Sequence, residues 1–159
     1  MDRTTLLKKR ATFKYLLFNW YILRIFIPMR ITKDNIHEFI EGTTMDCDYR
    51  DITHIDYIPD NIKYFYCIDN ELTELPKLPE SLKYLYCSGN QLTELPKLPD
   101  ELIHLNCYSN KLTSLPKLPE SLIHLNCSNN NLPYEVSLGN LKEHNKLLKR
   151  KEILKRICT

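Results

Sequence analysis

The apolar and polar positions of this chain recur in the same order at a fixed interval. The stretch SLKYLYCSGNQLTELPKLPD begins at Ser81, and closely similar stretches begin at Asn61 and Glu101, each 20 residues away. A copy that decays towards its end begins at Ser121, and a degenerate copy begins at Glu41. Self-similarity at such a period indicates a stack of small structural repeats. We therefore expect an elongated repeat fold of about five turns.

Each repeat contains a segment whose alternation predicts a short strand. Side chains two residues apart share one face of a strand, so Leu85 and Cys87 are expected in the core, while Tyr84 and Tyr86 point outward. One repeat cannot bury its own apolar side, so successive repeats must stack on one another. The strands should then form a parallel ladder, with equivalent residues of neighbouring repeats side by side.

Two residue types keep their place in the ladder. The Cys of each strand is interpreted as a small core residue, and the Asn three positions later is expected to bond backbone groups of the bend that follows the strand. Arg50 stands where the first repeat would have this Asn, which suggests a terminal repeat with altered geometry. The structural ladder comprises Cys47, Cys67, Cys87, Cys107, Cys127, Asn70, Asn90, Asn110 and Asn130.

The segment after each bend predicts an extended return of the chain. PKLP recurs at Pro76–Pro79, Pro96–Pro99 and Pro116–Pro119. Two prolines in four residues favour a polyproline-like path and are incompatible with a helix interior. The side of the repeats opposite the strands is therefore expected to be non-helical.

Residues 42–132 resemble leucine-rich repeat proteins. Leu82, Leu85, Cys87, Asn90 and Leu92 fit the template L-x-x-L-x-L-x-x-N-x-L, with Cys in place of the third Leu. The 20-residue length and the LP…LP…SL pattern are similar to the short repeats of bacterial effector proteins. The richness in Cys, Asn, Ile and Tyr is similar to leucine-rich repeat proteins of giant DNA viruses. The resemblance implies a curved solenoid that binds other proteins through its concave strand face.

Because the ends of a solenoid expose its core, we expect helical caps at both ends. Residues 1–41 are assigned to an N-terminal capping region, with an apolar helix over 13–27 and a small helix over 33–41. The run 13–27 carries Arg24 and is shorter than the roughly 20 apolar residues that span a bilayer. A capping helix is the favoured interpretation and a membrane anchor the alternative.

Residues 133–159 are assigned to a basic C-terminal capping helix, which the pattern predicts over 138–157. Leu141, Leu148 and Ile153 are expected to cover the last repeat. The remaining surface of this helix is rich in Lys and Arg, which is typical of a solvated face. The alternative is a patch for an acidic partner, an anionic lipid or a nucleic acid, although no nucleic-acid motif supports the last.

The net charge of +2 conceals a strong division along the chain. Residues 1–40 carry eight Lys or Arg and three Asp or Glu, a balance of +5. Residues 41–132 carry seven against 14, or −7, and residues 133–159 carry seven against three, or +4. An acidic repeat region therefore lies between two basic ends.

The candidate chemistry does not indicate an enzyme. The ladder cysteines are 20 residues apart, unlike the close Cys and His pairs of zinc sites. His104 and His124 occupy equivalent positions in neighbouring repeats, so their rings should be near each other, but no third group completes a metal site or a catalytic triad. We expect no catalytic residue, metal or cofactor. Buried unpaired thiols favour an intracellular, reducing location, which would be the host cytoplasm for a viral or effector-like protein.

The outward side of the predicted strands is unusually rich in tyrosine. Five of the ten tyrosines fall there, and Tyr is enriched at protein interfaces. We predict a monomeric protein-interaction module that binds another protein, whose identity the sequence does not give. The alternatives are a repeat-containing adaptor of a ubiquitin-ligase system and a structural protein tethered to a membrane through residues 13–27. The predicted binding residues are Tyr64, Tyr66, Tyr84, Tyr86, His104, Tyr108 and His124.

Overall fold

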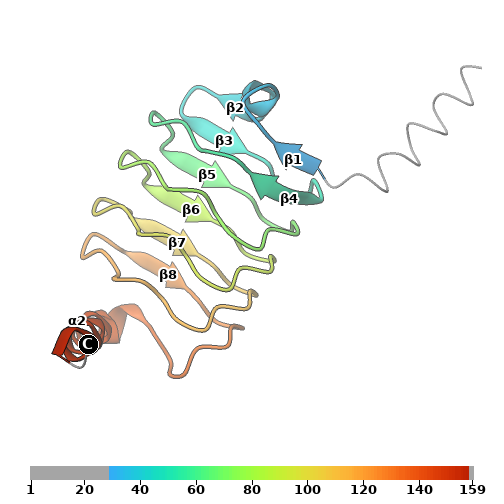
Figure 1. The fold of residues 1–159 in the computed structure, drawn as a ribbon. Helices are drawn as coiled ribbons and strands as arrows, with labels where there is room; N and C mark the ends of the chain where they lie inside the picture. The colour runs from blue at the N-terminus through green and yellow to red at the C-terminus, as the bar shows by residue number, and fades with distance from the viewer. Residues whose placement is uncertain (1–28, 158–159) are drawn as a thin grey trace, which may run out of the picture.

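The computed structural model describes residues 29–157. These residues form a parallel β-solenoid in which each turn adds one short strand to a common ladder (Figure 1). The helix predicted over 13–27, with its alternative of a membrane anchor, lies outside the described residues. Within residues 29–157, no helix is both long enough and apolar enough to cross a bilayer.

The ladder is a six-stranded sheet in the order β2-β3-β5-β6-β7-β8. Within this sheet, β3, β5, β6, β7 and β8 pair in parallel, and each residue lies beside the residue 20 positions later. Tyr64 therefore lies beside Tyr84, and Tyr84 beside His104. Equivalent positions of the sequence repeat are thus true neighbours in space. The strands of this ladder are β3 (Thr44–Asp46), β5 (Tyr64–Tyr66), β6 (Tyr84–Tyr86), β7 (His104–Asn106) and β8 (His124–Asn126).

The core runs along the solenoid as repeated rows of one side chain per turn. Leu82, Leu85 and Cys87 are fully buried, and so are their counterparts in the turns beside them. The prediction of a core facing inward from each strand is confirmed. The PKLP segments return the chain without helix, and the Leu and second Pro of each are buried. The return therefore closes the core from the side opposite the strands, as the proline content predicts.

The N-terminal end differs from the prediction of a helix over 33–41. Only one turn of 3-10 helix forms there, η1 (Ile36–Phe39), and it buries Ile36 and Phe39. The chain then enters β2 (Ile40–Glu41), which pairs antiparallel with β3 around Gly42. Pairing with the ladder satisfies backbone groups that a longer helix would have left unpaired at the sheet edge. Within the described residues, this end is thus covered by a hairpin instead of a helix.

A second, two-stranded sheet closes the return side of the first turn. β1 (Met29–Ile31) pairs in parallel with β4 (Ile52–Ile55), and both strands lie at the N-terminal end of the solenoid in Figure 1. Ile31 and Ile52 are fully buried there. β4 is the segment of the first turn that corresponds to the extended return of later turns. In the first turn this segment pairs with β1, whereas in later turns it forms no strand.

The C-terminal end carries the predicted helix. It begins as the 3-10 turn η2 (Leu138–Asn140) and continues as α2 (Leu141–Ile157). Leu141 is buried and Leu148 is half-buried, as expected of cover residues, but Ile153 is 46% exposed. The prediction for Ile153 is wrong because the helix extends beyond the last turn before this residue is reached.

Candidate functional site

The turn asparagines fix the geometry of the strand ends. The Nδ2 group of Asn90 donates to the carbonyl oxygens of Cys67 (2.8 Å) and Cys87 (3.2 Å), and its Oδ1 accepts from the backbone N–H of Leu72 (3.0 Å). One buried amide thus connects its own turn to the preceding one. Asn70, Asn110 and Asn130 make equivalent bonds.

This arrangement explains Arg50. A turn Asn bonds to the turn before it as well as to its own, and the first repeat follows no other repeat. Asn70, which belongs to the second turn, bonds to the first: its Oδ1 accepts hydrogen bonds from the backbone N–H groups of Arg50 (3.1 Å) and Ile52 (2.9 Å). The first turn has altered geometry nonetheless, because Asp51 as well as Tyr49 adopts a positive φ there.

The residue before each turn position lies in the left-handed region. Asp69, Ser109 and Asn129 have φ near the 66° of Gly89. At Gly89 a side chain would also collide with its neighbour, because an added Cβ would lie 1.9 Å from Oδ1 of Asp69. This sharp bend directs the chain from the strand into its return and keeps the outward strand face free of loops.

The outward face carries a continuous stack of rings, which we call the aromatic face (Tyr64, Tyr66, Tyr84, Tyr86, His104, Tyr108 and His124). In its first row, the ring centroids of Tyr64 and Tyr84 lie 4.7 Å apart and their planes differ by 15°. Tyr84 and His104 follow at 4.7 Å, and His104 and His124 at 4.1 Å. The expected proximity of the two histidines is confirmed.

A second row runs beside the first. The rings of Tyr66 and Tyr86 stack at 5.1 Å with planes 10° apart. The hydroxyl of Tyr86 lies 3.5 Å from Nδ1 of His104, so the two rows are in contact. Tyr108 stands in the next row and is 43% exposed. The structure therefore brings six of the seven predicted residues into contact with one another on the outward side of the ladder, whereas Tyr108 lies beyond the end of β7.

The electrostatics of the aromatic face differ between its ends. The pKa of His104 is lowered, first because burial penalises the charged ring and second because a charge on His124 would repel it. At the other end, burial raises the pKa of Tyr66, and Tyr86, Tyr64, Asp46 and Asp48 add to the rise. The pKa of Asp48 is also raised by burial, although the N–H of Ile68 donates to its carboxylate and opposes the shift. The shifts at His104 and Tyr66 thus both favour the uncharged ring.

The ladder cysteines face the interior and offer no reactive group. All five thiols are buried and free. Burial raises the pKa of Cys87 to about 12, so the thiol stays protonated at neutral pH. Among residues 29–157, no cluster of three or more His, Cys, Asp or Glu side chains could hold a metal ion.

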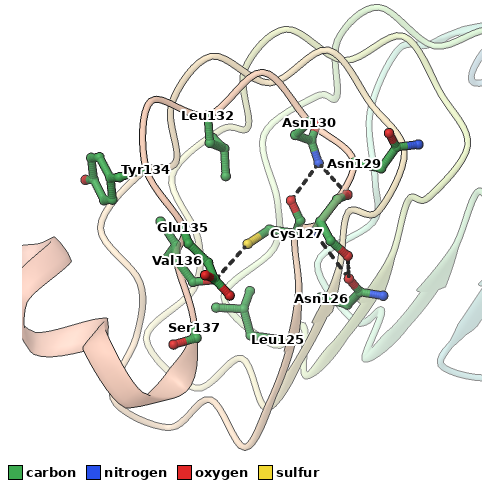
Figure 2. Close-up of a pocket in the computed structure, with 11 residues that line it drawn as sticks. Leu125, Asn126, Cys127, Asn129, Asn130, Leu132, Tyr134, Glu135, Val136 and Ser137 are labelled. Carbon is green, nitrogen blue, oxygen red and sulfur yellow. Dashed lines mark hydrogen bonds between the residues drawn. The ribbon is translucent and has the colours of Figure 1, made fainter.

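A pocket of about 420 Å³ lies at the C-terminal end, between the last turn and the segment that leads into α2 (Figure 2). Leu125, Leu132 and Val136 contribute its apolar part, while Asn and Ser side chains line the rest. The Cys127 thiol donates to the carbonyl oxygen of Val136 across 3.2 Å. The pocket is the incompletely filled end of the core, and its lining holds one ionisable carboxylate, Glu135, and no base to pair with it.

Sequence reasoning missed two residues that attach α2 to the solenoid. Asn145 makes two bonds to the backbone of Leu118, donating to its oxygen (2.7 Å) and accepting from its nitrogen (2.9 Å). His144 is 2% exposed and contacts the oxygen of Pro116 (3.1 Å) and the hydroxyl of Tyr134 (2.9 Å). Leu118 and Pro116 lie 27 and 28 positions before their partners in the sequence, so helical periodicity carries no signal for these contacts.

Comparison with known proteins agrees with this geometry. A family model described as Leucine Rich repeats (2 copies) matches residues 80–120. Among curated proteins, none matches the sequence significantly. A Shigella effector LRR domain is similar in structure, with a TM-score of 0.62 and 32% identity, over 70% of this chain and 50% of that one. YopM from Yersinia enterocolitica WA-314 is similar with a TM-score of 0.51 and 29% identity, over 60% of this chain and 26% of that one.

The chain thus spans half of one of these effector structures and about a quarter of the other. The resemblance to giant-virus proteins stays a prediction. The solenoid, its register, the matched family and the two effector structures agree with one another. The described residues therefore have a leucine-rich repeat fold that is similar to the repeat domains of these bacterial effector proteins.

Proposed function

We propose that the protein is a non-catalytic module that binds another protein through its aromatic face. The observation that carries this proposal is the stack of Tyr and His rings on the outward side of the strands, where the tyrosines and His104 stay partly exposed and His124 is exposed. Tyr combines a large contact area with few rotatable bonds and one polar group. Exposed rings of this kind gain from being covered by a partner.

Preorganisation supports the same proposal. Each ring is held by its neighbours at 4.1–5.1 Å, so binding would restrict few additional rotamers. The short strands and the Asn-fixed bends make the backbone beneath the rings rigid. A preorganised surface of stacked rings suits a folded protein or an extended peptide. Effector-like relatives and buried free thiols support an intracellular site of action.

The test is affinity capture with a triple variant, Tyr64→Ala, Tyr84→Ala and Tyr86→Ala. We expect this variant to lose the partner that the unaltered protein retains, because the central rings of both rows are removed. The matched control replaces three exposed residues of the return side, Lys77→Ala, Lys97→Ala and Lys117→Ala, and should retain the partner. Circular dichroism and urea unfolding establish that each variant is folded.

Truncating stacked rings could also weaken the fold, so a milder variant accompanies the first. Tyr84→Phe together with Tyr86→Phe keeps the stack and removes two hydroxyls, and it should weaken capture without lowering stability. Equal capture by the unaltered protein and a folded triple variant would refute the proposal. The roles of ubiquitin-ligase adaptor and membrane-tethered structural protein stay predictions from the sequence.

A further inference from the structure

The first half of α2 alone is docked on the solenoid. Leu141 and His144 are buried, Asn145 bonds to the backbone of Leu118, and Leu148 is half-buried. From position 149 to 157 every side chain is exposed. Figure 1 shows α2 at the C-terminal end of the solenoid, beyond β8. The second half of the helix therefore contributes little to the chain's own core.

Large apolar side chains nevertheless lie on α2 outside its docked face, three of them in the second half. Leu147, Ile153, Leu154 and Ile157 are 40%, 46%, 60% and 73% exposed. At about 100° per residue, these four positions fall within an arc of about 120° on the helix. The arc lies roughly opposite the docked face. This apolar arc has no partner among the described residues, and its exposure to water is unfavourable.

Basic side chains surround the apolar arc. Residues 141–157 include seven Lys or Arg and two Glu, a balance of +5. Lys149 lies on one side of the arc and Lys151 on the other, while Arg150 falls within it and can extend its guanidinium outward along its aliphatic stem. An apolar face bordered by cations is typical of helices that lie in the interface of a membrane.

Charge selects the occupant of this surface. A second copy of the helix would bring two surfaces of +5 together, which disfavours self-association. We propose that the second half of α2 binds the surface of an anionic lipid bilayer, with the apolar arc at the boundary of headgroups and acyl chains and the lysines at lipid phosphates. The acidic repeats, with a charge of −7, would be repelled by the anionic bilayer, so the molecule would approach the bilayer with α2 facing it. This proposal is independent of the aromatic face.

The test is co-sedimentation of the full chain with vesicles. The probe is phosphatidylcholine vesicles with and without about 30% phosphatidylserine, a content in the range of anionic leaflets. We expect binding to the anionic vesicles and at least about tenfold weaker binding to the neutral ones. Binding to the anionic vesicles should fall at 0.5 M NaCl, because the Debye length is then between about 3 and 10 Å and salt screens the attraction. Equal binding to both vesicle types, or no binding to either, would overturn the proposal.

Two double variants separate the apolar and the charged contributions. The first variant, Leu154→Ala with Ile157→Ala, keeps helix propensity and removes apolar area. The second variant, Lys149→Gln with Lys151→Gln, removes two positive charges. Each variant should lower the partition coefficient for anionic vesicles at least about tenfold. Ile123→Ser, which removes an exposed apolar residue from the solenoid, and Lys77→Gln with Lys117→Gln are the matched controls and should bind as the unaltered protein does. Unchanged partition in both helix variants would refute the proposal. So would a dimer, seen by light scattering, that the Ala variant dissociates.

Discussion

At the scale of single residues, the turn asparagines do more than their place in the repeat predicts. Their expected role was to bond the bend that follows their own strand. The structure adds a bond from each Nδ2 to a carbonyl in the preceding turn, such as Cys67 for Asn90 and Cys87 for Asn110. The repeat pattern cannot reveal this connection, because it reports positions within one turn and not the partners between turns.

Replacing Asn90 by Ala should lower the free energy of unfolding by about 1–3 kcal/mol. The change leaves the buried N–H of Leu72 and the carbonyl of Cys67 without their partner. Urea unfolding followed by circular dichroism measures the loss. Asn131→Ala, at an exposed position beside the last turn, is the control and should change stability by no more than about 0.5 kcal/mol. A loss at Asn90 no larger than at Asn131 would contradict the bridging role.

At the scale of elements, the repeats were predictable and the ends were predictable only in part. The 20-residue spacing fixes which residues share a row, so the strands, their parallel register and the outward tyrosines follow from the sequence. The ends have no repeat to guide them. The helix expected over 33–41 shortens to η1 because Ile40 and Glu41 pair with β3 instead.

The C-terminal helix was predicted from the sequence, but the polar residues that attach it to the solenoid were not. Its existence follows from its pattern, but its mode of attachment does not. Apolar spacing favours Ile153 as a cover residue, whereas the structure uses His144 and Asn145 to bond the backbone at Pro116 and Leu118. Polar residues that bond to the backbone of the return segment in this way carry no periodic signal.

We expect Asn145→Ala to loosen α2 at its point of attachment. The variant removes both bonds to Leu118, so the amide hydrogen of Leu118 should exchange faster, and stability should fall by about 1–2 kcal/mol. Hydrogen exchange measured by NMR reports this amide directly. Lys146→Ala alters the exposed neighbouring residue and should leave the exchange rate unchanged. If the Leu118 amide remained equally protected in both variants, Asn145 would not be the attachment point.

At the scale of the whole molecule, the chain separates its surfaces by chemistry. The strands present neutral rings, the repeats as a whole are acidic, and the C-terminal helix is basic with an exposed apolar arc. Composition predicts the charge division and the register predicts which rings are neighbours. The ring geometry itself, with stacks at 4.1–5.1 Å across four strands, required the structure.

The proposed function requires that the partner docks on the aromatic face. Site-specific photo-crosslinking tests this docking most directly, with p-benzoylphenylalanine in place of Tyr84 on that face or of the exposed Lys97 on the return side. We expect one crosslinked protein from position 84, which is absent or much weaker from position 97 and is suppressed by Tyr64→Ala. Crosslinking from position 97 with none from position 84 would contradict it.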